Sequence, residues 1–329
     1  NMGLPARSWL GWQIPIRTDE AHGRARIIEA PAEKLAASMD RGEIAVVAGF
    51  QGGTADGRIT TLGRGGSDTS AVAVAAALGC PCDIYTDVDG VYTTDPRIEA
   101  KARRLARISY EEMLEMASLG AKVLQTRSVE LAMAHRVPVR VLSSFVEPEQ
   151  VAAIDAGELG TIICDEEEVM EQRIVSGVAY SRDEAKITLY GLPDRPGVSS
   201  KLFGRLADAN VNVDMIVQSH ARHADAANME FTVGKRDAAR AMAIVQEAQP
   251  EIGFEEARVD EDVAKVSVIG VGMRSHAGVA KTMFSALADK GVNIQVISTS
   301  EIKISVLIDA AYTELAVRSL HAAYGLDQL

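Results

Sequence analysis

The sequence has few aromatic residues, few cysteines and no long apolar run. Aromatic residues make up 5% of the 329 residues, which argues against a stacking surface for single-stranded nucleic acid. Its three cysteines, Cys80, Cys82 and Cys164, show no repeated spacing, so we expect no disulfide framework and a reducing environment. No apolar stretch reaches the length of a membrane span, and the first residues lack the pattern of a signal peptide. These absences predict a globular cytoplasmic protein.

Basic residues are also in the minority. The chain has 34 Lys and Arg against 46 Asp and Glu, a formal net charge of -12. Such a surface repels phosphate backbones and anionic membranes, so we expect neither nucleic acid nor a membrane as a partner. The length allows two or three domains, and the 47% of hydrophobic residues are ordinary for globular proteins.

The first half of the chain alternates strand-like and helix-like segments. Residues 43–50 form an apolar run typical of a strand that is buried on both faces of a parallel sheet. Residues 69–79 are rich in Ala and Val and end in Gly, which predicts a buried helix. Further strands are expected at 83–85 and 137–142, and further helices at 109–118 and 125–135. This alternation predicts a layered α/β domain.

The second half contains an internal repeat. Residues 186–191 parallel residues 265–270, and later matches keep a constant offset, as in Val211-Asn212 and Val292-Asn293. Each copy has the pattern strand, Gly-led turn, helix, strand, strand, helix, which is typical of a ferredoxin-like α+β module. The second copy lacks a final strand, and we infer that a spare strand at 174–180 completes it, so that the two modules are interleaved.

These patterns divide the chain into an α/β domain, a connection with an acidic run, and a tandem of small modules. The expected bounds are 1–150 for the α/β domain, 151–173 for the linker and 174–329 for the tandem, with modules at about 184–260 and at about 264–329 plus strand 174–180.

The strongest local signal is the loop at residues 63–68, Gly-Arg-Gly-Gly-Ser-Asp. Glycines allow the backbone to approach a phosphate closely, and the N-terminus of the following helix supplies free N–H donors. Arg64 can bind a carboxylate or phosphate through two parallel hydrogen bonds, and Asp68 can orient a reacting group. The structural alternative is a Gly-rich turn with Asp68 or Thr69 as the N-cap residue. The loop lacks the Gly-Lys-Ser/Thr ending of a P-loop.

Two further segments carry polar residues at places where ligands bind. Residues 85–97 follow a predicted strand, and ligands bind at the carboxyl ends of strands in open α/β sheets. There, acidic groups could hold Mg²⁺ indirectly, Tyr92 could stack on a base and Arg97 could reach a phosphate. A turn-rich surface loop is the alternative. Lys122 follows a Gly between two helical stretches, where it could point at a nucleotide, although a lone Lys is usually solvated.

Together these segments resemble aspartate kinases. The resemblance rests on residues 47–52 (Val-Ala-Gly-Phe-Gln-Gly), 60–68, 85–97 and 120–124 (Gly-Ala-Lys-Val-Leu). Residues 297–306 resemble the second ACT module of the same family. The similarity covers nearly the whole chain, and it implies an amino-acid-kinase-like layered α/β catalytic domain followed by two ferredoxin-like ACT modules.

The resemblance implies transfer of the γ-phosphoryl group of ATP, with Mg²⁺, to the β-carboxylate of L-aspartate. This is the first step toward lysine, threonine and methionine, with feedback regulation through the ACT modules. It places aspartate and the phosphates at Arg64, Ser67 and Asp68. It places the nucleotide at Thr86, Asp87, Tyr92, Arg97, Lys122 and Val123.

An amino-acid effector, lysine or threonine or both, is implied at the strand–helix turns of the ACT modules. Asp194 or Asp214 would suit its ammonium, and N–H groups at a helix start would suit its carboxylate. The implied effector residues are Asp194, Gly197, Asn212, Asp214 and Gln218 in the first copy, and Ser275, His276, Gly278, Asn293 and Thr299 in the second. The alternative is that these residues only cap helices and strands. Paired ACT modules further imply a homo-oligomer.

Two family features do not occur in the 329 residues. Aspartate kinases have an early Lys-Phe/Tyr-Gly-Gly-Ser/Thr-Ser loop, whose Lys lies against the transferring phosphate, and a later Ser/Thr-x-Gly-Glu segment. Because the chain opens at Asn1 without either, we expect an N-terminal segment with the catalytic Lys to be missing and this polypeptide alone to be inactive. A non-catalytic, amino-acid-binding regulatory chain is the alternative, and the loop at residues 63–68 argues against it.

Overall fold

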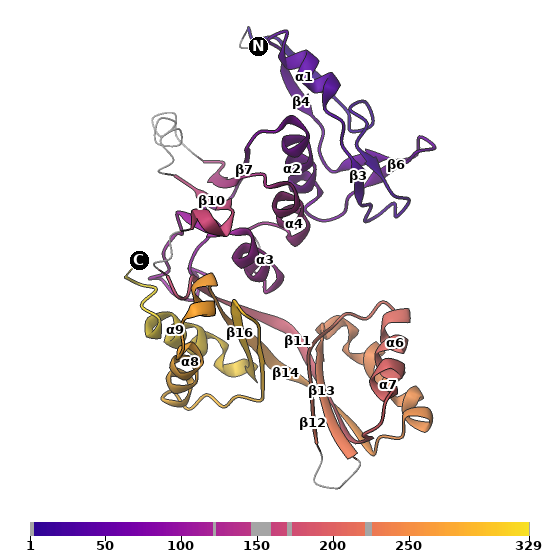
Figure 1. Ribbon diagram of the computed structural model, residues 1–329, viewed down its shortest axis with the longest axis vertical. Coiled ribbons are helices and arrows are strands. Elements are labelled where there is room, and N and C mark those ends of the chain that lie inside the picture. The colour runs from indigo at the N-terminus through magenta and orange to yellow at the C-terminus, as the bar shows by residue number, and fades with distance from the viewer. Residues whose placement is uncertain (1–2, 121–122, 146–158, 170–172, 221–225, 329) are drawn as a thin grey trace. The chain divides into compact units, whose positions relative to one another are not determined.

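The computed structural model describes residues 3–120, 123–145, 159–169, 173–220 and 226–328 (Figure 1). The chain forms two compact units. Unit 1 comprises Asn1–Thr93 and Ala102–Ser176, and unit 2 comprises Thr94–Lys101 and Gly177–Leu329. Within the described ranges, no helix combines the length and the apolar character that a membrane span requires.

Unit 1 has the expected α/β organisation. Its main sheet has the order β7-β9-β10-β8, in which β7 and β9 are parallel and β10 runs antiparallel to β9. Side chains of α2 and α4 meet those of β7, β9 and β10 in an apolar layer that includes Val72, Val129 and Ile84. The bounds are β7 (Cys82–Thr86), β8 (Arg107–Ser109), β9 (Val139–Ser143), β10 (Thr161–Cys164), α2 (Gly66–Leu78), α3 (Tyr110–Ser118) and α4 (Thr126–His135).

The N-terminal part of unit 1 carries a parallel pair, β1 (Ala6–Trp9) with β4 (Ile44–Val47), and helix α1 (Glu33–Met39). It also carries a small sheet of order β3-β2-β5-β6, with bounds β2 (Arg17–Thr18), β3 (Ile27–Glu29), β5 (Gln51–Gly53) and β6 (Ile59–Thr61). The expectation that β4 is buried on both faces is wrong. Ile44 and Val46 are 49% and 53% exposed, because the described residues cover only the face that carries Ala45 and Val47.

The stretch 151–173, expected to be a linker, contains a strand of the main sheet. Residues 161–164 form β10, which lies between β9 and β8, and Ile163 and Cys164 are almost completely buried. The linker prediction is therefore wrong for these residues. A strand of four residues is too short to show a clear period beside an acidic run, so the local pattern did not reveal it.

Unit 2 is built on one six-stranded antiparallel sheet of order β12-β13-β11-β14-β16-β15. Two long strands, β11 and β14, run through both copies of the repeat. Residues 177–181 of β11 pair with residues 265–269 of β14 in the second copy, and residues 184–190 pair with 256–263 in the first. This is the pairing that interleaved modules require. The strands are β11 (Gly177–Pro193), β12 (Val213–His220), β13 (Ala226–Val233), β14 (Glu256–Ile269), β15 (Val296–Thr299) and β16 (Lys303–Asp309), and the helices are α6 (Val198–Asp208), α7 (Ala238–Ile252), α8 (Val279–Ala288) and α9 (Thr313–Ala323).

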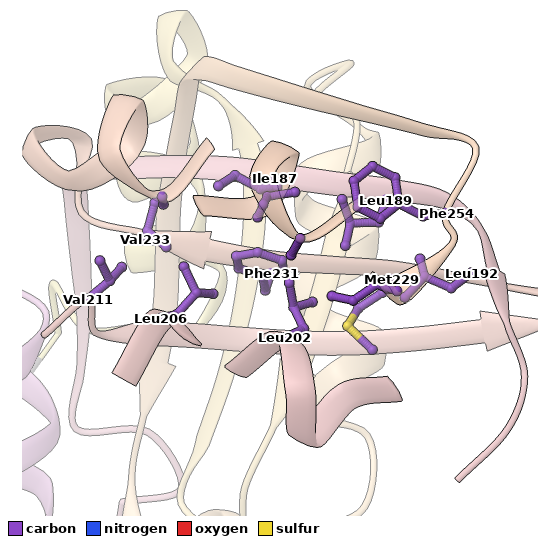
Figure 2. Packing of buried hydrophobic residues seen from close by; sticks show 14 of the residues in the cluster. Ile187, Leu189, Leu192, Leu202, Leu206, Val211, Met229, Phe231, Val233 and Phe254 are labelled. Atoms are coloured by element: carbon purple, nitrogen blue, oxygen red, sulfur yellow. The ribbon is translucent and has the colours of Figure 1, made fainter. Parts of the chain in front are cut away.

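The core of the first copy lies between its strands and helices α6 and α7 (Figure 2). In β11, Ile187 and Leu189 point to the same face because side chains alternate along a strand. In α6, Leu202 and Leu206 are four residues apart and share one face. Phe231 of β13 lies among them with no exposed surface, and its ring meets that of Phe203 edge to face at 5.5 Å.

Candidate functional site

The Gly-rich loop connects β6 to α2, as the pattern predicted. Gly63 and Gly65 have φ angles of 80° and 70°, a left-handed conformation that favours glycine. A Cβ atom on Gly65 would lie 1.8 Å from Cγ and 2.6 Å from Cβ of Gln125, the N-cap residue of α4. The loop therefore passes so close to the start of α4 that only glycine fits at residue 65.

A second turn, at Gly49-Phe50, is joined to the same loop. The N–H of Phe50 donates to Oγ of Ser70 at 3.0 Å, and the N–H of Leu62 donates to the carbonyl of Phe50 at 3.0 Å. Phe50 has a φ of 72°, a conformation that costs a non-glycine residue about 1–2 kcal/mol. The Val-Ala-Gly-Phe-Gln-Gly and Gly-Arg-Gly-Gly-Ser-Asp motifs thus form one structure, which these hydrogen bonds hold together.

Arg127, a residue that the sequence analysis missed, supports this structure from α4. Its guanidinium donates to the carbonyls of Leu62 and Ala25, both at 2.7 Å. A positive charge in the first turn of a helix opposes the helix dipole. In the sequence, this unfavourable position in the first turn of a helix could have indicated that Arg127 has a specific partner outside α4.

The residues expected to meet substrate, Arg64, Ser67 and Asp68, begin α2. The N-cap residue of α2 is Gly65, so the alternative in which Asp68 or Thr69 caps the helix is wrong. Arg64 and Ser67 are exposed, and Asp68 is half-buried. Burial raises the pKa of Asp68, and a long hydrogen bond from Ser67 Oγ at 3.4 Å offsets this only in part. An exposed guanidinium therefore precedes the N-terminus of α2, and a half-buried carboxylate without a capping role lies in its first turn.

The loop after β7 carries the expected nucleotide residues Thr86, Asp87 and Tyr92. Thr86 Oγ1 donates to Asp87 Oδ1 at 3.2 Å, and Asp87 is exposed at the carboxyl end of β7. Tyr92 OH donates to both carboxylate oxygens of Asp89, at 3.1 and 3.2 Å. The chain reverses direction between α2 and β7, so the helix and the strand are antiparallel. The N-terminus of α2 and the carboxyl end of β7 therefore lie at the same end of the sheet.

Thr161 anchors this loop, and the sequence analysis missed it because it lies in the stretch read as a linker. Its hydroxyl accepts from the N–H of Val91 at 2.8 Å and donates to the carbonyl of Leu105 at 2.6 Å. A Cβ on Gly90 would lie 2.5 Å from the same oxygen. Thr161 is fully buried, so the loop from residue 87 to residue 92 has a defined end.

The other three expected nucleotide residues, Arg97, Lys122 and Val123, do not lie in the loop after β7. Arg97 belongs to unit 2, where its guanidinium binds Asp95 through two contacts, Nε–Oδ1 at 3.0 Å and Nη2–Oδ2 at 2.7 Å. The structure thus does not group Arg97 with Thr86 and Asp87 in one unit. Lys122 lies outside the described residues. Val123 is two residues from Gln125, so the chain that follows Lys122 lies beside the Gly-rich loop.

In unit 2, the two Gly-led turns occupy equivalent places. Gly197 and Gly278 are the N-cap residues of α6 and α8, with φ angles of 94° and 102°, and a Cβ atom on either would meet nothing within 4 Å. Asp194 is exposed, and its carboxylate lies 3.4 Å from Nδ1 of His220. Near the second turn, Nδ1 of His276 lies 2.9 Å from the carbonyl of Gly272 and 3.1 Å from the hydroxyl of Ser275. The remaining effector candidates Asn212, Gln218, Asn293 and Thr299 are exposed.

Asp214 differs from Asp194, because a cation of the chain already occupies it. Lys265 Nζ lies 2.7 Å from Asp214 Oδ2 and 2.8 Å from Glu184 Oε1. The Asp194 carboxylate thus faces a histidine, which is a cation only when protonated, whereas the Asp214 carboxylate binds a lysine ammonium.

The fold and these loops are typical of one class of protein, in which an amino-acid-kinase-like α/β domain is joined to paired ACT modules. In agreement, the amino acid kinase family matches residues 1–143, and the ACT domain matches residues 187–249 and 266–324. The aspartate kinase Ask_LysC of Stutzerimonas stutzeri is 56% identical over 327 residues, which cover 99% of this chain and 77% of that protein. The chain belongs to the aspartate kinases.

Solved structures agree with this assignment. Aspartokinase III of E. coli, in complex with aspartate and ADP, is 29% identical with a TM-score of 0.77, over 97% of this chain and 70% of that one. The same enzyme in complex with lysine and aspartate is 31% identical with a TM-score of 0.74, over 97% and 69% of the two chains. Both the α/β part and the ACT part of the predicted fold are confirmed.

Proposed function

We propose that this aspartate kinase transfers the γ-phosphoryl group of ATP to the β-carboxylate of L-aspartate in the cytoplasm, as the first step toward lysine, threonine and methionine. The observation that supports this most directly is the loop at residues 63–68. There Arg64 is exposed just before α2, and Asp68 lies in the first turn of α2 without a capping role. Gly65 allows the loop to pass close to Gln125 at the start of α4. In phosphoryl transfer the protein mainly positions the reactants and balances charge, and these residues suit that task.

Within this proposal, Arg64 binds the carboxylate of aspartate or a phosphate, and Ser67 and Asp68 orient the reacting groups. Thr86, Asp87 and Tyr92 bind the nucleotide, together with Lys122 and Val123. Among the described residues, no cluster of His, Cys, Asp and Glu is suited to hold a metal ion. Within the proposal, Mg²⁺ arrives with ATP, because Mg²⁺ is usually bound by phosphate oxygens, water and one or two carboxylates. It would neutralise charge on the phosphates.

The test measures aspartyl phosphate, trapped as the hydroxamate, with the protein expressed from the complete gene. Arg64→Ala should lower kcat/KM by about 10²-fold, the loss typical of one preorganised charge contact. Arg58→Ala, which removes an exposed arginine from the neighbouring hairpin, is the matched control and should change little. Equal effects of the two substitutions would leave the loop without a catalytic role.

Asp68→Asn separates catalysis from folding. The folded-state pKa of Asp68 is raised, so its contribution to stability is present at low pH and is lost as the pH rises through that pKa. At neutral pH the ionised carboxylate therefore opposes folding, and Asp68→Asn should lower kcat without lowering Tm. A parallel loss of Tm and kcat would mean that Asp68 is structural.

We further propose that lysine, threonine or both bind the ACT modules and lower activity, and that these modules form an interface between copies of the chain. The two equivalent Gly-led turns and the exposed carboxylate of Asp194 support this proposal. The complex of E. coli aspartokinase III with lysine and aspartate gives it a precedent. Allosteric couplings are typically about 1–3 kcal/mol, so dose–response curves should resolve the inhibition.

A further inference from the structure

Lys265 is a buried cation whose position in the fold is unusual. Its side chain is 7% exposed, and Glu184, its inner partner, is 9% exposed, whereas Asp214 is 61% exposed. Burial alone would lower the pKa of Lys265, but the charges and hydrogen bonds of Glu184 and Asp214 outweigh burial and raise it. Lys265 is therefore held as a charged ammonium between two carboxyl groups.

The three residues come from strands that are not all neighbours. Lys265 lies on β14 and Glu184 on the adjacent β11, but Asp214 lies on β12, and two strands separate β12 from β14 in the sheet. In a flat sheet, three strand spacings would place β12 about 14 Å from β14, further than a lysine side chain reaches. The sheet therefore curls, and Lys265 bridges the two modules where β12 meets β15.

Asp214 also controls the shape of β12. The pairing of β12 with β13 shifts register between Asp214 and Val217, and Met215 has a φ of 47°. The second carboxylate oxygen of Asp214, Oδ1, accepts a hydrogen bond from the N–H of Met215 at 2.8 Å. The Met215 side chain packs against Val263, Val296 and Leu307 of the other strands. A left-handed methionine persists only where its surroundings hold it, and here Asp214 and this apolar contact do so.

This arrangement has the chemistry of an occupied ligand site. The buried carboxylate of Glu184 and the solvent-facing carboxylate of Asp214 both bind one primary ammonium, the side chain of Lys265. Lys303 also acts electrostatically on Asp214 from β16. We propose that Glu184 and Asp214 form an ammonium-binding site which Lys265 fills in the ligand-free chain, and that a primary ammonium of an effector reaches Asp214 only by competing with Lys265. The second half of this proposal rests on the regulation proposed above, and the first half does not.

Competition has a consequence for regulation. When a ligand ammonium takes Oδ2 of Asp214, the bridge from β14 to β12 opens, and the carboxylate whose Oδ1 accepts from the N–H of Met215 exchanges its cation. Ligand binding in the first module would then be felt at Val296 and Leu307 in the second. The sign is testable, because removal of an internal competitor strengthens ligand binding, whereas removal of a residue that only positions Asp214 weakens it.

The first experiment tests the ammonium site by chemical complementation. Lys265→Ala removes the atoms of n-propylammonium, so this ion should raise the Tm of the variant by several degrees at tens of millimolar, through preferential binding to the folded state. 1-Propanol lacks the charge and tetramethylammonium lacks N–H donors, so neither should do so. Lys186→Ala is the matched control, since Lys186 is the half-buried counterpart in the repeat and forms no ion pair within the described ranges.

A rise that is equal with 1-propanol, equal in Lys186→Ala, or absent overturns the proposed site. If Lys265→Ala does not fold, the double variant Lys265→Ala/Glu184→Gln removes the uncompensated buried charge. It retains Asp214, so we expect a smaller rise in Tm that still favours propylammonium over 1-propanol, and an equal or absent rise overturns the site.

The second experiment measures the Kd of lysine and of threonine by calorimetry. Competition predicts a Kd at least tenfold lower in Lys265→Ala than in the wild type, and no change in Lys186→Ala. An unchanged or higher Kd refutes the competition. If the wild type and Lys265→Ala both bind neither amino acid, the regulatory proposal fails, while the propylammonium result still decides whether Glu184 and Asp214 form an ammonium site.

Discussion

Gly65→Ala probes the closest contact of the candidate active site. At a φ of 70°, alanine costs about 1–2 kcal/mol from conformation alone. The new Cβ would also lie 1.8 Å from Cγ of Gln125 and 2.6 Å from its Cβ. The Cγ can rotate away, but the Cβ cannot, and carbon atoms approach to only about 3.5 Å, so the backbones must separate by about 1 Å. Overpacking of this kind adds about 1–3 kcal/mol.

Gly42→Ala is the matched control, because Gly42 has a φ of 75° and nothing within 4 Å of its would-be Cβ. It should show the conformational cost without the clash. We expect a loss of about 1–2 kcal/mol for Gly42→Ala and about 2–5 kcal/mol for Gly65→Ala. Displacement of the loop by about 1 Å should also lower kcat by about 10²-fold in Gly65→Ala alone.

Urea unfolding and the hydroxamate assay measure the two effects. Gln125→Gly should partly rescue Gly65→Ala, because it removes both clashing atoms and glycine is tolerated at an N-cap position. If Gly65→Ala and Gly42→Ala lose equal stability and equal activity, or if Gln125→Gly rescues neither, the contact between the Gly-rich loop and α4 does not constrain the site.

Three further outcomes are expected. Thr161→Val keeps the shape of the side chain but leaves the N–H of Val91 and the carbonyl of Leu105 unpaired, which should lower the free energy of unfolding by about 2–4 kcal/mol. It should also weaken ATP binding measured by calorimetry, and an unchanged affinity would show that the loop after β7 needs no anchor. Phe231→Ala should lower the stability of unit 2 by about 3–5 kcal/mol, seen as a lower urea midpoint, while ATP affinity stays the same; a midpoint within error of the wild type would contradict the packing in Figure 2. Asp194→Asn should shift the lysine or threonine inhibition curve to higher concentration with uninhibited kcat unchanged, and an unshifted curve would remove Asp194 from the effector site.

Local conformation was predictable where one residue type decides it. The glycines at 63, 65, 197 and 278 were placed in turns before helices, and all four have left-handed φ angles. The Ala- and Val-rich segment forms α2, which ends at Gly79. The repeat and its spare strand anticipated the shared pairing of β11 with β14. The turns and α2 follow from periodicity and backbone sterics within about ten residues, and the repeat shows as a match between two distant segments.

Burial and partner choice were less predictable. The apolar run at 43–50 contains strand β4, yet alternate residues of β4 are exposed, because burial depends on which elements cover each face. Strand β10 was hidden in a stretch that reads as a linker. Arg97 was expected beside the nucleotide, but it pairs with Asp95 in unit 2.

The sequence alone determined the family, the order of the domains and the loop with Arg64 and Asp68, because short motifs carry that information. Only the tertiary structure decided which groups meet across long separations. Arg127 binds the carbonyl of Ala25 102 positions away, and Lys265 binds Asp214 51 positions away. Such pairs depend on strand order and on the curl of a sheet, and neither leaves a trace in the local pattern of residues. For that reason Asp214 looked like an open ligand group in the sequence and proved to be paired in the fold.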